Sequence, residues 1–275
     1  MRYSVLIISP PGYTHSECFR EVAETINDGL HKLGHISSVT KELVPGARHI
    51  VLGANLLTQY PLQLPTDSIL YNLEQVKDNE LWVNPQFLSI LRRYTLWDYS
   101  PQNVDELKTF GIHVSAVLPI GFFEGLTRIQ HSTTKSVDVV FVGSMNDRRR
   151  HILVAMQEAG LKVGWLFNAY GAERDAGMAQ AKLLLNMHYH KAKILEEVRI
   201  SYCLANKFAV LSEHSSDPAL DAEWAKGVVF AAYDELVLKA VELCADDAKR
   251  EKIAADGFEF IRKKSLMPYL QSALY

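Results

Sequence analysis

Short apolar runs that favour β-strands alternate along this sequence with segments of helical periodicity, and no other feature limits the fold as strongly. Residues 4–9 (SVLIIS) predict a buried strand. Apolar residues then recur every three or four positions from Phe19 to Leu33, and Gly34 provides a helix end. Because strands joined by helical crossovers pair in parallel, the sequence predicts an α/β protein with parallel sheets.

The first half of the chain predicts two helices and a series of strands. Strands are expected at residues 4–9, 35–41, 49–56, 68–73, 94–99 and 113–119. The first helix is expected to begin near Thr14, whose spacing to Glu17 fits a capping box, and the second covers residues 103–110. Residues 123–136 lack periodicity and predict a linker.

A second series of strands and helices begins at Val137. Strands are expected at residues 137–142, 161–167, 181–188, 208–213 and 227–231. Helices are expected at residues 147–160, 173–180, 193–206 and 234–264, the last broken near Asp246, with a short helix after Pro268. We therefore expect a first domain at residues 1–125, a second at 135–264, and a C-terminal helix or tail at 265–275.

Composition narrows the classes of function. The net charge of −3 over 275 residues provides no basic field for nucleic acid. The cysteines, Cys18, Cys203 and Cys244, have no metal-ligand spacing and fit a reducing compartment. No stretch approaches the roughly 20 apolar residues that span a bilayer. We expect a cytoplasmic protein; a peripheral membrane contact and the oligomeric state stay open.

The stretch FVGSMNDRRR places an unusual charge pattern at a strand–turn–helix junction. Gly143 and Ser144 follow a strand, and Arg148, Arg149 and Arg150 stand in the first turn of a helix. Cations there oppose the helix dipole by roughly 0.3–1 kcal/mol each, whereas a bound diphosphate would reverse the sign. Successive helical side chains fan out, so only one or two of the three can face a ligand. The alternative is an exposed basic turn.

Two further junctions in the second half carry candidate binding residues. Tyr170 and Gly171 precede a helix and could meet a nucleotide base, or could form a plain βα turn. A second block runs from Asn186 and His188 to Glu196 and Arg199, and its carboxylate is the group type that grips ribose hydroxyls. Glu197 is expected to pack or cap, and His188 with His190 lacks a third metal ligand.

The strand ends of the first half supply candidates for acceptor binding and for a general base. Gly12 and Gly121 stand where strands deliver backbone to a binding site, and His15, Glu74 and Asp98 are the catalytic candidates. A purely structural role is the alternative for each of them. No GxSxG, Walker A, HExxH, paired CxxC or strict GxGxxG motif is present, which argues against common hydrolases, NTPases, metalloproteases and dehydrogenases.

These motifs together resemble those of a known enzyme class. The runs DVVFVGSMNDRRRHIL, YGAERD and AKLLLNMHYHKAKILEEVRISYCLANKFAVLSE are similar to the donor-binding domain of GT-B glycosyltransferases of the broad group 1 class. The phrases YNLEQ, LWDYSPQN and LPIGF resemble its partner domain. The resemblance implies two Rossmann-like parallel-sheet domains that face a central cleft. It also implies transfer of a sugar, hexosyltransferase-like, from a nucleotide-sugar to an unidentified hydroxyl acceptor without a metal or other cofactor.

The resemblance also assigns expected roles to the donor-side residues. The turn at Gly143 and Ser144 and the following arginines would meet the diphosphate, Tyr170 and Gly171 would lie near the base, and residues 186–199 would hold ribose and sugar hydroxyls.

One departure from the family concerns its acidic pair. Retaining members commonly have two glutamates eight positions apart, whereas Leu204 and Ala205 stand eight positions after Glu196 and Glu197. The stereochemical outcome therefore stays open. Two alternatives are kept: a non-catalytic binding protein that retains the fold, and another reaction on the same fold, such as nucleotide-sugar epimerisation or a phosphorylase-like activity.

Overall fold

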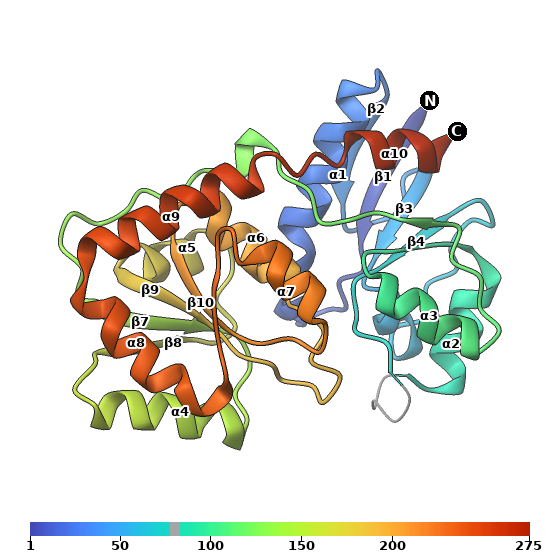
Figure 1. The fold of residues 1–275 in the computed structure, drawn as a ribbon. Helices are drawn as coiled ribbons and strands as arrows, with labels where there is room; N and C mark the ends of the chain where they lie inside the picture. Colours follow the sequence, from blue (N-terminus) through green and yellow to red (C-terminus); the bar gives the residue numbers. More distant parts are fainter. Residues whose placement is uncertain (78–82) are drawn as a thin grey trace. The chain divides into compact units, whose positions relative to one another are not determined.

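The computed structural model describes residues 1–77 and 83–275, which form two compact units (Figure 1). The first unit consists of Met1–Phe123 and Ser265–Tyr275, and the second of Glu124–Lys264. The C-terminal residues 265–275 thus pack with the first unit. No helix in the described part of the chain is long and apolar enough to cross a membrane.

The first unit is built on a parallel sheet of order β2-β1-β3-β4-β5-β6. Its strands are β1 (Arg2–Ile7), β2 (Ile36–Thr40), β3 (Arg48–Leu52), β4 (Ile69–Asn72), β5 (Thr95–Asp98) and β6 (Ala116–Val117). Its helices are η1 (Thr14–Phe19), α1 (Arg20–Lys32), η2 (Ala54–Thr58), α2 (Pro85–Arg93), α3 (Pro101–Thr109) and α10 (Met267–Leu274). Strand β1 is apolar over both faces because both are covered: Val5, Leu6 and Ile7 are fully buried.

Close helix packing fixes the C-terminal segment in the first unit. A β-carbon on Gly29 of α1 would lie 2.8 Å from the side chain of Leu270 in α10. A β-carbon on Gly121 would lie 2.7 Å from that of Leu266. The lack of a side chain at Gly121 therefore has a packing reason, in addition to the acceptor-side role expected from the sequence.

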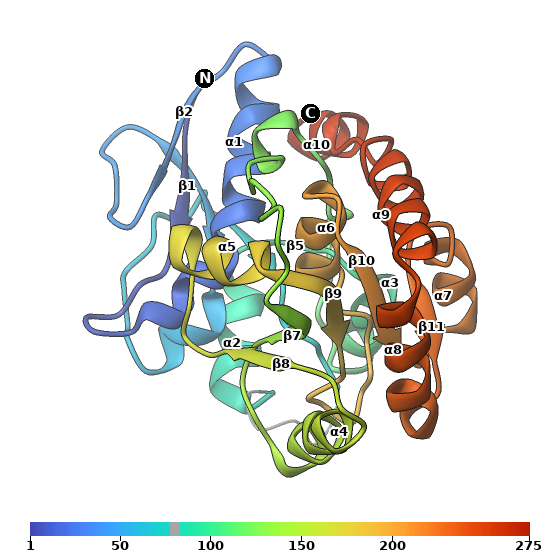
Figure 2. The ribbon, with the colours of Figure 1, turned by 90° about the vertical axis from the view of Figure 1, so that its left-hand side faces the viewer.

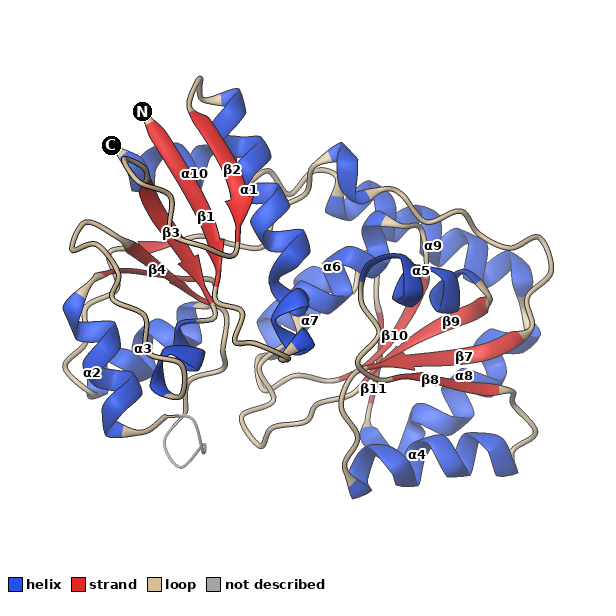
Figure 3. Cartoon of the chain, turned by 180° about the vertical axis from the view of Figure 1, so that it is seen from behind, coloured by secondary structure: helices blue, strands red, loops and turns tan. Residues whose placement is uncertain are grey.

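The second unit is built on a parallel sheet of order β11-β10-β9-β7-β8. Its strands are β7 (Val137–Val142), β8 (Val163–Leu166), β9 (Ala181–Asn186), β10 (Ala209–Glu213) and β11 (Val229–Ala231). Its helices are η3 (Glu124–Leu126), α4 (Asp147–Glu158), α5 (Gly171–Ala179), α6 (Glu197–Ala205), α7 (Pro218–Trp224), η4 (Tyr233–Glu235), α8 (Leu236–Ala245) and α9 (Asp247–Ile261). Helices α4 and α8 cover one face, and α5, α6 and α9 the other (Figures 2 and 3).

The prediction of two parallel-sheet α/β domains is confirmed, with differences at particular elements. The third strand ends at Leu52 rather than at residue 56, because Gly53 adopts a left-handed φ of 81° and starts the short helix η2. Helices α2 and α7 were not predicted, although each begins with an Asn or Asp cap followed by proline. The expected helix at 193–206 begins only at Glu197, after a loop in which Lys193 has a φ of 49°.

Candidate functional site

The candidate donor site lies in the second unit, where β7, β9 and β10 end. Parallel pairing sets Ser212 of β10 beside Asn186 of β9, and Gly143 directly follows β7. The carboxyl ends of parallel strands are the usual ligand edge of such sheets. Several residues predicted from separate motifs therefore meet at one edge.

Arg199 and Gly143 form the centre of this group. Gly143 has a φ of 142°, and a β-carbon at this residue would lie 3.2 Å from Nη2 of Arg199. The Nη1 atom of Arg199 donates to Oδ1 of Asn186 at 2.6 Å. Trp165 donates its indole N–H to the carbonyl oxygen of Gly143 at 2.8 Å. The partly exposed guanidinium of Arg199 is thus held against bare backbone, with donors left for an anion.

Glu196 accepts from the residues around it. Asn186 donates Nδ2 to Oε2 of Glu196 at 3.0 Å, and Nδ1 of His188 lies 3.0 Å from the same oxygen. Burial by itself would raise the pKa of Glu196, but His188, Arg199 and Asn186 outweigh it and lower the pKa to about 2. Glu196 is therefore a carboxylate across the physiological pH range.

His188 links Glu196 to the backbone beyond β10. The ring is almost fully buried, and its Nε2 lies 3.0 Å from the carbonyl oxygen of His214. Its Nδ1 faces Oε2 of Glu196 at 3.0 Å, so the ring lies between this carboxylate and the His214 carbonyl.

Arg149 is part of the core rather than of an exposed surface. Only 2% of its surface is exposed. Its guanidinium donates to the carbonyl oxygens of Ser144 and Met187, and lies 3.9 Å from Glu196. Burial and the charge of Arg199 lower the pKa of Arg149 to about 9, which leaves it a cation at neutral pH. Arg149 therefore stabilises the Gly143–Ser144 turn through its hydrogen bond to the Ser144 carbonyl oxygen.

Arg148 is paired with the carboxylate of Glu213, which was not among the site residues predicted from the sequence. Both ends of its guanidinium donate to Glu213, the last residue of β10, which is 1% exposed. Lys193 adds a second cation to Glu213 at 3.0 Å, and the Arg148 guanidinium stacks 3.9 Å from the Tyr233 ring centroid. The anion that offsets Arg148 at the helix start is thus a protein carboxylate. Arg150, the third arginine, is exposed.

The remaining donor-side candidates lie at the start of α5 or on the following loop. Tyr170 is the residue before α5, and Gly171 has a left-handed φ of 53°. Burial lowers the pKa of His190 to about 4, so its ring is neutral at physiological pH. Burial raises the pKa of Glu197 to about 7, in agreement with the expected packing role. No group of three or more metal-ligating side chains occurs among the described residues.

In the first unit, Asp98 is a fully buried hydrogen-bond hub. It accepts from Asn72 at 2.7 Å, from Asn103 at 2.9 Å, and from the backbone N–H of Ser100 at 2.8 Å. Burial raises its pKa to about 7 despite these bonds. This arrangement fits the structural alternative for Asp98, because its lone pairs are occupied by the ends of β4 and β5 and by α3.

Glu74 and His15 follow the carboxyl ends of two strands of that sheet, β4 and β1. Burial raises the pKa of Glu74 to about 7, against a hydrogen bond from Asn55 that lowers it. The charge of Glu74 in turn helps to raise the pKa of Tyr13, after burial and Cys18. The Tyr13 ring meets the His15 ring edge-on, with centroids 5.9 Å apart. Gly12, beside them, is exposed with a left-handed φ of 75°.

Sequence reasoning missed Glu213, Trp165, Tyr13 and Asn55. Glu213 could have been found, since it ends a predicted strand in the same way as the selected residues do. No sequence pattern of this kind marked Trp165. It lies on the edge strand β8, and only the parallel register with β7 brings it beside Gly143.

No family model matches the chain. Uncharacterized proteins of Acanthamoeba polyphaga mimivirus are similar: L137 is 29% identical over 206 residues, 70% of this chain and 27% of that protein. L138 is 35% identical over 149 residues, 53% of this chain and 17% of that protein. The chain thus spans well under half the length of these two relatives.

Solved glycosyltransferase structures share the fold over essentially the whole chain. HepE of Anabaena, solved with UDP-glucose, is 11% identical with a TM-score of 0.63, covering 100% of this chain and 98% of HepE. Sucrose-phosphate synthase of Thermosynechococcus elongatus is 12% identical with a TM-score of 0.60, covering 99% and 97%. WaaG, a glycosyltransferase of lipopolysaccharide biosynthesis, is 11% identical with a TM-score of 0.59, covering 99% and 98%. The chain therefore has the GT-B fold, as predicted.

Proposed function

We propose that this protein is a glycosyltransferase that moves a sugar from a nucleotide-sugar donor to a hydroxyl acceptor. The observation that carries the proposal is the group formed by Arg199, Asn186 and Glu196 beside the bare backbone of Gly143. Solved structures of the same fold include HepE with UDP-glucose and HepE with UDP. These complexes support a nucleotide-sugar donor for the proposed reaction.

In the proposed donor complex, Arg199 and the Gly143–Ser144 turn hold the diphosphate. A guanidinium suits phosphate oxygens, and a glycine lets them approach the backbone. Glu196 accepts hydroxyl hydrogens of the ribose or sugar, for which an ionised carboxylate is the appropriate partner. Arg148 and Arg149 act indirectly, since protein acceptors already occupy their donors.

The proposed reaction needs charge stabilisation more than covalent help from the protein. The acceptor oxygen bonds to the anomeric carbon, the bond from that carbon to the diphosphate breaks, and its electron pair leaves with the phosphate oxygen. Arg199 stabilises this developing charge. The acceptor proton needs a base. Burial raises the pKa of both Glu74 and Asp98 to about 7, and we take Glu74 because hydrogen bonds from Asn72, Asn103 and Ser100 occupy the carboxylate of Asp98. The sugar, the acceptor and the anomeric outcome are left open, and metal independence and a cytoplasmic location remain predictions.

The sharpest test compares Arg199→Ala with Arg150→Ala in calorimetric titrations of UDP, GDP, ADP and CMP. We expect one nucleotide to bind the wild type, and Arg199→Ala to weaken it about tenfold or more, as for a lost charge-assisted hydrogen bond. Arg150→Ala is the matched control, because this arginine is exposed at the same helix start. Absence of nucleotide binding would overturn the proposal. Stronger loss in Arg150→Ala would move the diphosphate to the helix start.

A panel of UDP- and GDP-sugars then separates the alternatives. Turnover that requires an added acceptor favours transfer, whereas conversion of the sugar without an acceptor favours an epimerase. Donor binding with neither outcome favours a binding protein that retains the fold.

A further inference from the structure

A cavity of about 530 Å³ lies at the amino-terminal ends of β9 and β10 in the second unit. Ala181 and Ala209, the first residues of these strands, line it. Asn186 and Glu213 end the same strands, and at about 3.3 Å per residue they lie roughly 15 Å away. The cavity is therefore separate from the candidate donor site, at the opposite edge of the sheet.

One wall of the cavity is the segment that the sequence predicted to be a linker. Asn206 fixes this segment: its Oδ1 accepts from the backbone N–H groups of Arg128 and Ile129, both at 2.8 Å. The carbonyl oxygen of Asn206 accepts from Nε2 of His131 at 2.7 Å. The wall is thus formed before any ligand arrives, which lowers the ordering cost of binding.

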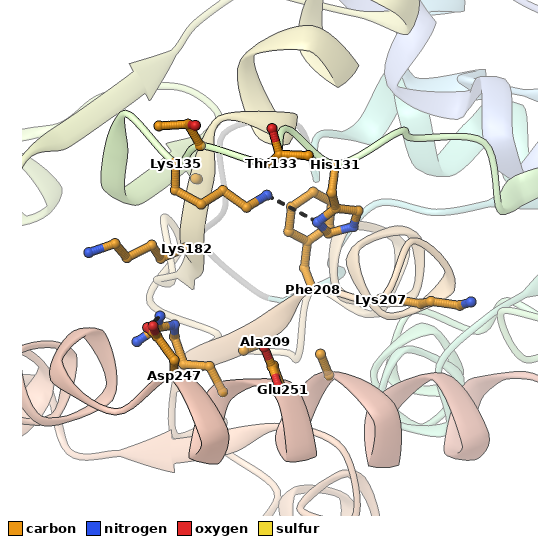
Figure 4. Close-up of a pocket in the computed structure, with 13 residues that line it drawn as sticks. His131, Thr133, Lys135, Lys182, Lys207, Phe208, Ala209, Asp247 and Glu251 are labelled. Carbon is orange, nitrogen blue, oxygen red and sulfur yellow. Dashed lines mark hydrogen bonds and ion pairs between the residues drawn. The ribbon is translucent and has the colours of Figure 1, made fainter.

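Lys135 in this wall is a cation without a carboxylate partner among the ion pairs of the described residues. Its Nζ donates to the carbonyl oxygen of Ala179 at 2.8 Å and lies 3.2 Å from Nδ1 of His131. Because Nε2 of His131 donates to Asn206, Nδ1 is the accepting nitrogen, and Lys135 donates to it. Figure 4 shows the amine of Lys135 directed toward His131 across the cavity wall. A third N–H of this partly buried ammonium remains for a ligand.

Two further cations of the cavity, Lys182 and Arg250, already have protein partners. Lys182 lies on β9, with its Nζ 2.8 Å from Asp138. Arg250 donates to the carbonyl oxygens of Leu243 and Cys244 and pairs with Asp247, so its planar fork is occupied. A lysine amine binds as a compact point charge and is a common partner of phosphate.

We propose that this cavity is a binding site for a small phosphorylated sugar, with the phosphate at Lys135. Its volume is within the range of small-molecule sites. Thr133, Thr134 and Glu251 line the rest and offer hydroxyl and carboxylate partners for sugar hydroxyls. Phe208 is buried beneath the ring of His131, with centroids 4.3 Å apart, so no broad aromatic face is left for a nucleobase.

Isothermal titration of the full chain with glucose 6-phosphate, inorganic phosphate and glucose tests this site. We expect saturable binding of glucose 6-phosphate, weaker binding of phosphate, and none of glucose. Lys135→Gln should weaken the binding of glucose 6-phosphate by at least about tenfold. Lys182→Gln and Lys207→Gln are the matched controls and should stay within about twofold, because Lys182 already pairs with Asp138 and both amines are directed away from Lys135 (Figure 4).

The outcomes separate this inference from the proposed function. Titration of UDP reports on the other edge of the sheet, and all three lysine variants should bind it as the wild type does. Absence of saturable glucose 6-phosphate binding overturns the inference, as does wild-type affinity in Lys135→Gln. Equal affinity for phosphate and glucose 6-phosphate overturns the sugar assignment. Failure of UDP binding alone bears only on the proposed function.

Discussion

The guanidinium of Arg199 occupies the place toward which a side chain on Gly143 would point: its Nη2 lies 3.2 Å from the position of that β-carbon. These two residues stand on different elements, the end of β7 and the helix α6. Their contact sets how close a ligand can come to the backbone and to the cation at the same time.

Gly143→Ala should weaken nucleotide binding about tenfold or more, because the methyl group displaces Arg199 and the φ of 142° strains any side chain. Gly160→Ala is the matched control, since its φ is 88° and a β-carbon there meets nothing within 4 Å. It should lower stability by about 1 kcal/mol and leave the affinity unchanged. Calorimetry of both variants checks this, and equal losses of affinity would contradict the role of the contact.

Glu213→Ala should lower the free energy of unfolding by about 2–4 kcal/mol, since it leaves Arg148 and Lys193 side by side without their shared carboxylate. Urea unfolding measures the change. Lys239→Ala is the control: it breaks an exposed pair with Glu242, so its effect on the free energy of unfolding should be much smaller. A loss of stability in Glu213→Ala as small as that in Lys239→Ala would refute the role of Glu213 as the shared partner of Arg148 and Lys193.

Glu74 should control the pH dependence of turnover. With its pKa raised to about 7, the carboxylate form appears only as pH rises through 7, so the rate should rise over this range. Glu74→Gln should remove that limb of the profile while nucleotide affinity is retained. A rate profile whose limb near pH 7 survives in Glu74→Gln would exclude Glu74 as the base.

The same shift has a consequence for stability. A carboxyl whose pKa is higher in the folded state than in the unfolded state favours folding only while it is protonated, so its ionisation destabilises the protein as pH rises from about 4.5 to 7. Glu74→Gln should therefore be stabilising relative to wild type at pH 8, and the difference should shrink below pH 4.5. Thermal unfolding at both pH values gives the answer; a pH-independent difference would contradict the shift.

Asp98→Ala should lower the free energy of unfolding by about 2–3 kcal/mol, because it leaves Asn72, Asn103 and the Ser100 N–H with an acceptor missing. Asp105→Ala on the exposed side of α3 is the control, with a change of at most about 0.5 kcal/mol. Urea unfolding of both variants measures these changes in the free energy of unfolding. Unchanged stability in Asp98→Ala would reopen a direct role for this acid.

Much of the fold could be predicted because short segments determine their own structure. The strand at residues 137–142 has the bounds predicted for it, since its apolar run is flanked by polar turns. The start of α4 at Asp147 was also predicted, and Asn146 caps it. Where the prediction failed, a backbone conformation with positive φ interrupted the apolar pattern: Gly53 ends β3 early, and Lys193 lies in the loop before the late start of α6.

The sequence by itself determined the parallel α/β architecture and placed Gly143, Asn186, Glu196 and Arg199 at strand and helix ends. Only the tertiary structure decided which charges meet. Arg148 and Glu213 are 65 positions apart, so no local pattern reveals that this carboxylate, rather than a ligand, neutralises the helix start. The physical reason is that periodicity acts within about ten residues, whereas charge pairing depends on strand order and register, which the chain sets over its whole length.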